Sequence, residues 1–137
     1  MSWVVDTCIV IDAIGNASGQ WGASADLLVE LEPSGLVICP VSYVELAPSF
    51  QGDTERQNSF LETIGVEWEW PQWTREDTLC AHAAWQRQVA ARHDKKAPRR
   101  PLADILIGAF AMRYEGLVTR NPSDFADIFP SLAIRVP

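Results

Sequence analysis

Short apolar runs alternate along the chain with longer amphipathic stretches, and several of the runs end at a polar residue. Residues 3–5, 36–39 and 117–119 are apolar on both faces of an extended chain, which is typical of strands covered by helices on both sides. Residues 66–70 alternate between apolar and polar, as a half-exposed strand at a sheet edge does, and residues 132–136 resemble a last strand. The pattern therefore predicts a mostly parallel sheet.

The stretches between these strands carry helix signals. Residues 74–77 resemble a capped helix start, and in the long helix that follows, to about residue 91, we expect Leu79, Ala83 and Val89 to be buried. Further helices are predicted over residues 8–14, 23–32, from 42 onward, 53–64 and 102–114. Alternating strands and helices predict an α/β fold, a three-layer α/β/α sandwich around a central mostly parallel sheet.

Length and composition change this picture little. The 137 residues suit one domain, residues 1–137, and the formal net charge of -7 argues mildly against a protein that coats nucleic acid. The N-terminal apolar run carries two acids and no basic leader, so we expect a soluble cytoplasmic protein. Cys8, Cys39 and Cys80 lack metal-ligand spacing and are expected to be reduced thiols, and Cys8 has no evident base that would activate it as a nucleophile.

Four acidic residues stand where a parallel sheet would bring them together. Asp6, Glu45 and Asp124 each follow a predicted strand, and Asp104 lies in the first turn of a helix within an apolar run. The ligand crevice of such a sheet lies beyond the carboxyl ends of its strands. Clustered acids repel one another unless a cation lies between them, and carboxylate oxygens suit Mg²⁺ or Mn²⁺. Phosphoryl transfer is the chemistry that uses such a site.

Each acid also has a simpler interpretation. Glu45 completes a capping box with Ser42, and Asp104 would complement the dipole of its helix. Asn121 and Asp124 can be turn residues after the strand. Asp12, near the end of the first helix, is expected to be a solvent-facing acid, with a ligand role as the weaker alternative.

Four segments in this order resemble the PIN-domain ribonucleases and, in length and layout, the VapC-type toxins of type II toxin–antitoxin systems. They are Val5-Asp6-Thr7, Ser42-Tyr43-Val44-Glu45-Leu46, residues 102–109 and residues 119–125, and the similarity spans essentially the whole chain. The resemblance implies a PIN-like fold and a single PIN-like domain. It also implies a metal-dependent endoribonuclease that hydrolyses RNA phosphodiester bonds with Mg²⁺ or Mn²⁺ and thereby inhibits translation.

By the same resemblance, Asp6, Glu45 and Asp104 would be catalytic metal ligands, and Thr7 would help to position the metal or its water. Many members of the family have Asp where this chain has Asn121, so either Asp124 or Asn121 would fill the fourth position. The implied partners are an RNA substrate, a cognate VapB-like antitoxin whose C-terminal segment occupies the cleft, and a second copy of the chain in a homodimer. No membrane is implied.

Basic and aromatic residues suggest where RNA would lie. The expected RNA-binding residues attract phosphates and lie in or after the basic segment 92–100; they are Lys95, Lys96, Arg99, Arg100 and Arg120. A solvated loop is the alternative for that segment. The tryptophans could stack on bases, but core or interface packing is favoured; they are Trp21, Trp68, Trp70, Trp73 and Trp85. Trp68 and Trp70 would share one face of the edge strand and mark a protein-binding patch.

A second function remains open at this point. Asn121 could weaken the metal site, which would leave a PIN-like domain that binds RNA or a partner protein without cutting it. Metal-dependent turnover separates the two hypotheses.

Overall fold

The computed structural model describes residues 1–15, 21–93 and 100–137, and it contains a five-stranded sheet in the order β3-β2-β1-β4-β5. Every pair of neighbouring strands is parallel, with Val4 of β1 opposite Val37 of β2 and Leu117 of β4. The strands are β1 (Trp3–Val5), β2 (Leu36–Val37), β3 (Val66–Glu67), β4 (Gly116–Val118) and β5 (Ile134–Arg135). The predicted parallel sheet is confirmed, although most strands are shorter than the apolar runs.

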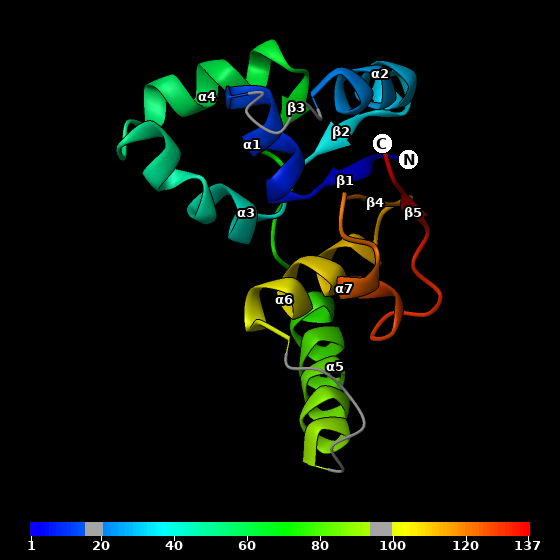
Figure 1. Cartoon of the computed structure of the whole chain (residues 1–137). Helices are drawn as coiled ribbons and strands as arrows, with labels where there is room; N and C mark the ends of the chain where they lie inside the picture. The colour runs from blue at the N-terminus through cyan, green and yellow to red at the C-terminus, as the bar shows by residue number, and fades with distance from the viewer. Residues whose placement is uncertain (16–20, 94–99) are drawn as a thin grey trace.

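Helices cover both faces of this sheet (Figure 1). The first three are α1 (Thr7–Gly15), α2 (Trp21–Leu31) and α3 (Pro40–Glu45). The others are α4 (Thr54–Thr63), α5 (Arg75–His93), α6 (Leu102–Ala111) and α7 (Ser123–Ala126). Helices α1, α2 and α4 lie on one side, while α5, α6 and α7 lie on the other, with α5 extending away from the sheet (Figure 1). The predicted three-layer sandwich is therefore confirmed.

The core follows from the alternation of side chains along β1. Val5 packs with α1, α2 and α4, while Val4 packs with α6 and α7 on the opposite face, and both valines are fully buried. A strand buried on both faces has no polar side, which explains why its sequence reads as a continuous apolar run.

The expectation for the buried face of α5 is wrong. Leu79 is 57% exposed and Val89 is 37% exposed, and Ala83 is also exposed. Helix α5 packs instead on α6 through Ala81 and Ala84, whose small side chains allow the two helices to approach closely. Among the helices within the described residues, none has the length and apolar character that crossing a membrane requires.

The predicted patch of Trp68 and Trp70 is also wrong. The strand ends at Glu67, so neither tryptophan belongs to it. Trp68 stacks on Tyr43 beside one core cluster, whereas Trp70 leans on Tyr114, which packs against the cluster on the other face.

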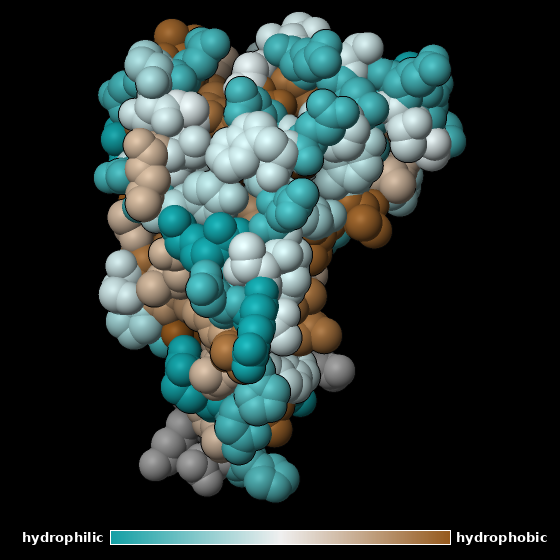
Figure 2. Space-filling model, turned by 180° about the vertical axis from the view of Figure 1, so that it is seen from behind, coloured by the Kyte–Doolittle hydropathy of each residue, from teal (hydrophilic) through white to brown (hydrophobic). Residues whose placement is uncertain are grey.

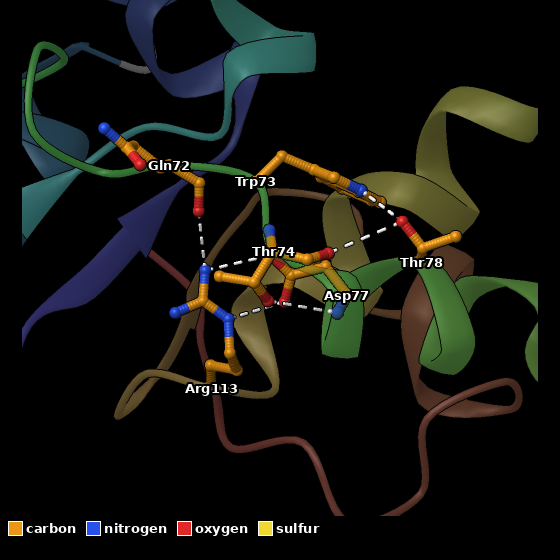
Figure 3. A network of polar contacts seen from close by, with 6 residues as sticks. All are labelled: Gln72, Trp73, Thr74, Asp77, Thr78 and Arg113. Atoms are coloured by element: carbon orange, nitrogen blue, oxygen red, sulfur yellow. Dashed lines mark hydrogen bonds and ion pairs between the residues drawn. The ribbon is translucent and has the colours of Figure 1, made fainter.

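A polar network fastens the start of α5 to the end of α6 (Figure 3). The carboxylate of Asp77 is fully buried. It accepts hydrogen bonds from Nε of Arg113 at 2.6 Å and from Nη2 of Arg113 at 2.9 Å. The backbone N–H of Thr74 donates to Asp77, and the N–H of Asp77 donates to the Thr74 hydroxyl, so the capped start predicted for α5 is confirmed. Arg113 also donates to the carbonyl of Gln72.

Gly116 stands where no side chain fits. A Cβ built there would lie 2.3 Å from the carbonyl oxygen of Ala133 and 2.6 Å from the ring of Trp3. We expect Gly116→Ala to lower the free energy of unfolding by about 2 kcal/mol, since the sheet would have to shift. Gly22→Ala is the control, because a Cβ at Gly22 meets nothing within 4 Å. Alanine also has a higher helix propensity than glycine, so this variant should not be destabilised. Urea unfolding of both variants measures the difference, and equal stabilities would contradict the prediction.

Candidate functional site

Asp6 lies directly after β1 at the first turn of α1. Its backbone N–H donates to the carbonyl of Val118, which continues the sheet, and its carboxylate accepts hydrogen bonds from the Thr7 N–H at 2.8 Å and the Thr119 hydroxyl at 2.7 Å. The Cys8 thiol donates to the same carboxylate at 3.5 Å. Burial raises the pKa of Asp6 above its ordinary value despite these hydrogen bonds, and the charge of Asp124 raises it further.

Glu45 is the last residue of α3, and its carboxylate accepts a hydrogen bond from the Thr7 hydroxyl at 2.7 Å. The capping-box interpretation is wrong, because α3 begins at Pro40 and Ser42 already lies inside the helix. Within the described residues, the buried Ser42 hydroxyl has no hydrogen-bond partner. Thr7 therefore links the strand end that bears Asp6 to the helix end that bears Glu45.

Asp104 lies in the first turn of α6 and is half-buried. Burial raises its pKa to about 6, and the negative charges of Asp6, Asp124 and Glu45 raise it in the same direction, while Arg100 opposes them. The four acids predicted from the sequence therefore lie close enough to repel one another at one end of the sheet.

Asp124 and Asn121 differ in what surrounds them. Asp124, in α7, accepts a hydrogen bond from Nη1 of Arg100 at 2.8 Å. The side chain of Asn121 is exposed, and its backbone N–H donates to the Thr119 hydroxyl at 3.0 Å. Thr119 thus joins Asp6 to the segment that carries both candidates for the fourth position.

The expectation for Asp12 is wrong, because it is only 4% exposed. Its carboxylate accepts hydrogen bonds from Nε of Arg120 at 2.6 Å and from the Ser24 hydroxyl at 3.4 Å. Arg120, predicted to bind RNA, is therefore already engaged in an ion pair whose acid is buried. Three other expected RNA-binding residues, Lys95, Lys96 and Arg99, lie outside the described residues.

The chemistry of the donor set fits a hard divalent cation. The site offers carboxylate oxygens, whereas the thiols are poor ligands or nucleophiles, since burial raises the pKa of Cys8 to about 11 and that of Cys39 to about 12. Within the described residues, no three His, Cys, Asp or Glu side chains are arranged so that they could hold one ion as they stand. Mg²⁺ commonly takes only one or two protein carboxylates and completes its shell with water, so a site for it does not require three acids around one point.

An apolar hollow of about 480 Å³ lies apart from these acids, on the far side of α6. Leu102 and Leu106 line it, and both are two positions from Asp104, which places them on the opposite side of the helix. Trp73 and Trp85 also line it, and both pack against the core cluster between α5 and α6, as the packing role favoured for the tryptophans predicts. Seen from behind, hydrophobic side chains are exposed at several places, among them the edge of the narrower lower part of the molecule (Figure 2).

Comparison with known proteins rests on the fold. No protein-family model matches the sequence, and neither does any curated protein. A crystal structure of VapBC2 from Rickettsia felis bound to a DNA fragment from their promoter contains a chain similar to this one, with a TM-score of 0.73 over 100% of this chain and 99% of that chain. The chain has a PIN-like fold. At 19% sequence identity the likeness concerns the fold alone.

Sequence reasoning missed the residues that hold the acids in place. Thr119 lies within a segment that carries the resemblance but was not expected to bind Asp6, and Cys8 was expected only to be a reduced thiol without a partner role. A threonine at the end of a buried strand beside another strand that ends in Asp is the signal that could have found the first contact.

Proposed function

We propose that this protein is a metal-dependent endoribonuclease of the VapC type, which inhibits translation by cutting RNA. The observation that carries the proposal is the gathering of Asp6, Glu45, Asp104 and Asp124 from four separate segments at the carboxyl end of a parallel sheet. Such a concentration of negative charge costs stability unless a cation offsets it. The PIN-like fold supports the assignment of this site to a nuclease.

Asp6, Asp104 and Glu45 would hold the Mg²⁺ or Mn²⁺ ion, with Asp124 or Asn121 at the fourth position. When bound, the ion supplies activation of water and neutralisation of charge on the scissile phosphate. Thr7 donates to Glu45 and Thr119 donates to Asp6, so these two hydroxyls hold the carboxylates in their orientation before any ligand arrives. No protein nucleophile is required.

The deciding experiment is incubation of the purified chain with a total small-RNA pool, in Mg²⁺ or Mn²⁺ and in EDTA. Discrete products that require the metal support the nuclease. Binding of RNA without any cutting, in a protein that also takes up no Mn²⁺, would favour the second candidate, a PIN-like domain that binds RNA or protein without cleaving it. Asn121 in place of an acid is the observation that favours this candidate.

We further propose a VapB-like antitoxin as the partner and a homodimer as the working form. The matched structure is of VapBC2 bound to a DNA fragment from their promoter. Co-expression with a gene neighbour, followed by measurement of the mass of the purified complex, tests both proposals.

Neutralising Asp104 should stabilise the metal-free protein near pH 7. The folded-state pKa of Asp104 is about 6, above the ordinary value of 3.8, so the folded state loses stability as the pH rises through that window. Above about pH 6 the full cost is present, and it shrinks as the pH falls and disappears only well below 3.8. We therefore expect Asp104→Asn to melt at a higher temperature than the wild type at pH 7.5 and by a much smaller margin at pH 4, as thermal unfolding in EDTA would show. A lower melting temperature at pH 7.5 would contradict the expectation.

A further inference from the structure

A groove of about 370 Å³ lies between α2 and the end of α4, two helices on the same side of the sheet (Figure 1). The residues of α2 that line it stand at positions i, i+4, i+7 and i+8, which form one stripe along a helix; they are Trp21, Ala25, Leu28 and Val29. Leu28 is buried, whereas Val29 is 69% exposed. Helix α2 therefore turns an apolar stripe toward an open groove as well as toward the core.

Two acidic side chains stand at one end of this groove. Glu32 directly follows α2, and Glu62 lies in the last turn of α4. A Cβ built at Gly65 would lie 3.3 Å from Oε1 of Glu32, so the Glu32 side chain extends from the end of α2 to the turn that follows α4. Among the residues that the structure describes, neither carboxylate has a hydrogen-bond or ion-pair partner.

The ends of the two helices add to the negative charge at this end of the groove. Helices α2 and α4 end at Leu31 and Thr63, and the last carbonyl groups of a helix carry partial negative charge. Neither helix has a basic residue in its last turn. Arg135 reaches the last turn of α2, where it pairs with Glu30. The groove thus has an apolar floor and an end whose negative charge is not offset.

A polypeptide with apolar side chains and a terminal positive charge complements this groove. The stem of a lysine or arginine side chain packs on apolar surface while its charged head remains at the rim, and a guanidinium has enough donors for two carboxylates. We propose that the groove binds an amphipathic segment of a partner protein, with its apolar residues on Trp21 and Val29 and an arginine between Glu32 and Glu62.

This groove is separate from the candidate nuclease site. Glu32 and Gly65 come shortly before β2 and β3, so the acidic end of the groove lies at the amino ends of the strands, whereas Asp6 follows the carboxyl end of β1. The inference therefore goes beyond the proposed function and does not depend on it.

A nuclear magnetic resonance titration of the ¹⁵N-labelled full chain tests the proposal. The probe is a blocked peptide of leucine and alanine that ends in arginine, and the matched peptide carries citrulline, which has the same shape without the charge. The arginine peptide should shift the amide signals of α2 and of residues 62–65. The citrulline peptide should bind on the order of tenfold more weakly, and added salt should narrow the difference.

Variants of the groove assign the binding to its residues. Glu32→Gln and Glu62→Gln should each weaken binding of the arginine peptide about threefold, and together on the order of tenfold, as exposed ion pairs do. Val29→Ser should weaken binding of both peptides about tenfold through lost apolar contact. Asp26→Asn is the matched control, because it removes an exposed carboxylate from α2 that does not line the groove. Thermal unfolding establishes that each variant is folded.

Three results would overturn the inference. The first is an arginine peptide that leaves the signals of the groove unchanged. The second is equal binding of the two peptides, or binding that the double glutamine variant retains at the strength of Asp26→Asn. The third is a shift of the groove signals with protein concentration alone, which would make a second copy of this chain the occupant. Cleavage of RNA and uptake of Mn²⁺ stay open to their own tests in each case.

Discussion

Asp6→Asn should abolish RNA cleavage while leaving the fold intact. Replacing a residue that merely orients a metal ligand costs about 10–100-fold, so loss of a ligand should cost at least roughly 100-fold. The substitution is nearly isosteric: the Asn oxygen can still accept from the Thr7 N–H, and the amide can donate to the Thr119 hydroxyl once that hydroxyl turns around. It also removes a charge whose burial is unfavourable, as the raised pKa of Asp6 indicates.

Cleavage of the RNA that the wild-type protein cuts should therefore be measured for each variant, together with thermal unfolding and Mn²⁺ binding of the same purified protein. Asp26→Asn, which removes one exposed carboxylate from α2, controls for the change in net charge. A variant at Asp6 that cuts at the wild-type rate would exclude the proposed site, and cleavage that persists equally in both variants and in EDTA would indicate a contaminating nuclease.

The parts of this site that could be predicted are those set by local pattern and by topology. Short runs apolar on both faces indicate a parallel sheet, and a parallel sheet brings its strand ends to one edge, so the sequence alone places Asp6 and Asp124 together. Asp104 is predicted to belong to the same site because it lies in the first turn of a helix and is surrounded by apolar residues. These inferences need only the order of the elements.

The parts that could not be predicted depend on contacts between distant residues. Glu45 matched a capping box with Ser42, yet the helix begins at Pro40 and the carboxylate meets Thr7, which lies 38 positions away in the sequence. Helix α5 has apolar residues around its circumference, so periodicity could not show that Ala81 and Ala84, rather than Leu79 and Val89, would face α6. Tertiary packing decided both, and it overrides local preference where several faces are equally apolar.

Arg113→Gln should produce the largest loss of stability among the substitutions considered. Asp77 is fully buried, and Arg113 supplies two of its hydrogen bonds, so removing the guanidinium leaves a buried carboxylate without its counter-ion. Breaking one side of such a pair costs about 3–5 kcal/mol, and we expect the lower end because Arg113 itself is 28% exposed. The guanidinium also lies over the rings of Phe110 and Tyr114, at 5.3 and 5.1 Å from their centroids.

Urea unfolding of Arg113→Gln, of Asp77→Asn and of the double variant separates the ion pair from the other contacts. Because Asn at position 77 keeps an oxygen for the Thr74 N–H and carries no charge, the double variant should be more stable than Arg113→Gln alone. If the free energy of unfolding of Arg113→Gln lies within about 0.5 kcal/mol of the wild-type value, the ion pair contributes nothing measurable to stability. A large loss of unfolding free energy would instead mean that the Asp77–Arg113 ion pair, which joins α5 to the end of α6, stabilises the part of the fold that bears Asp104.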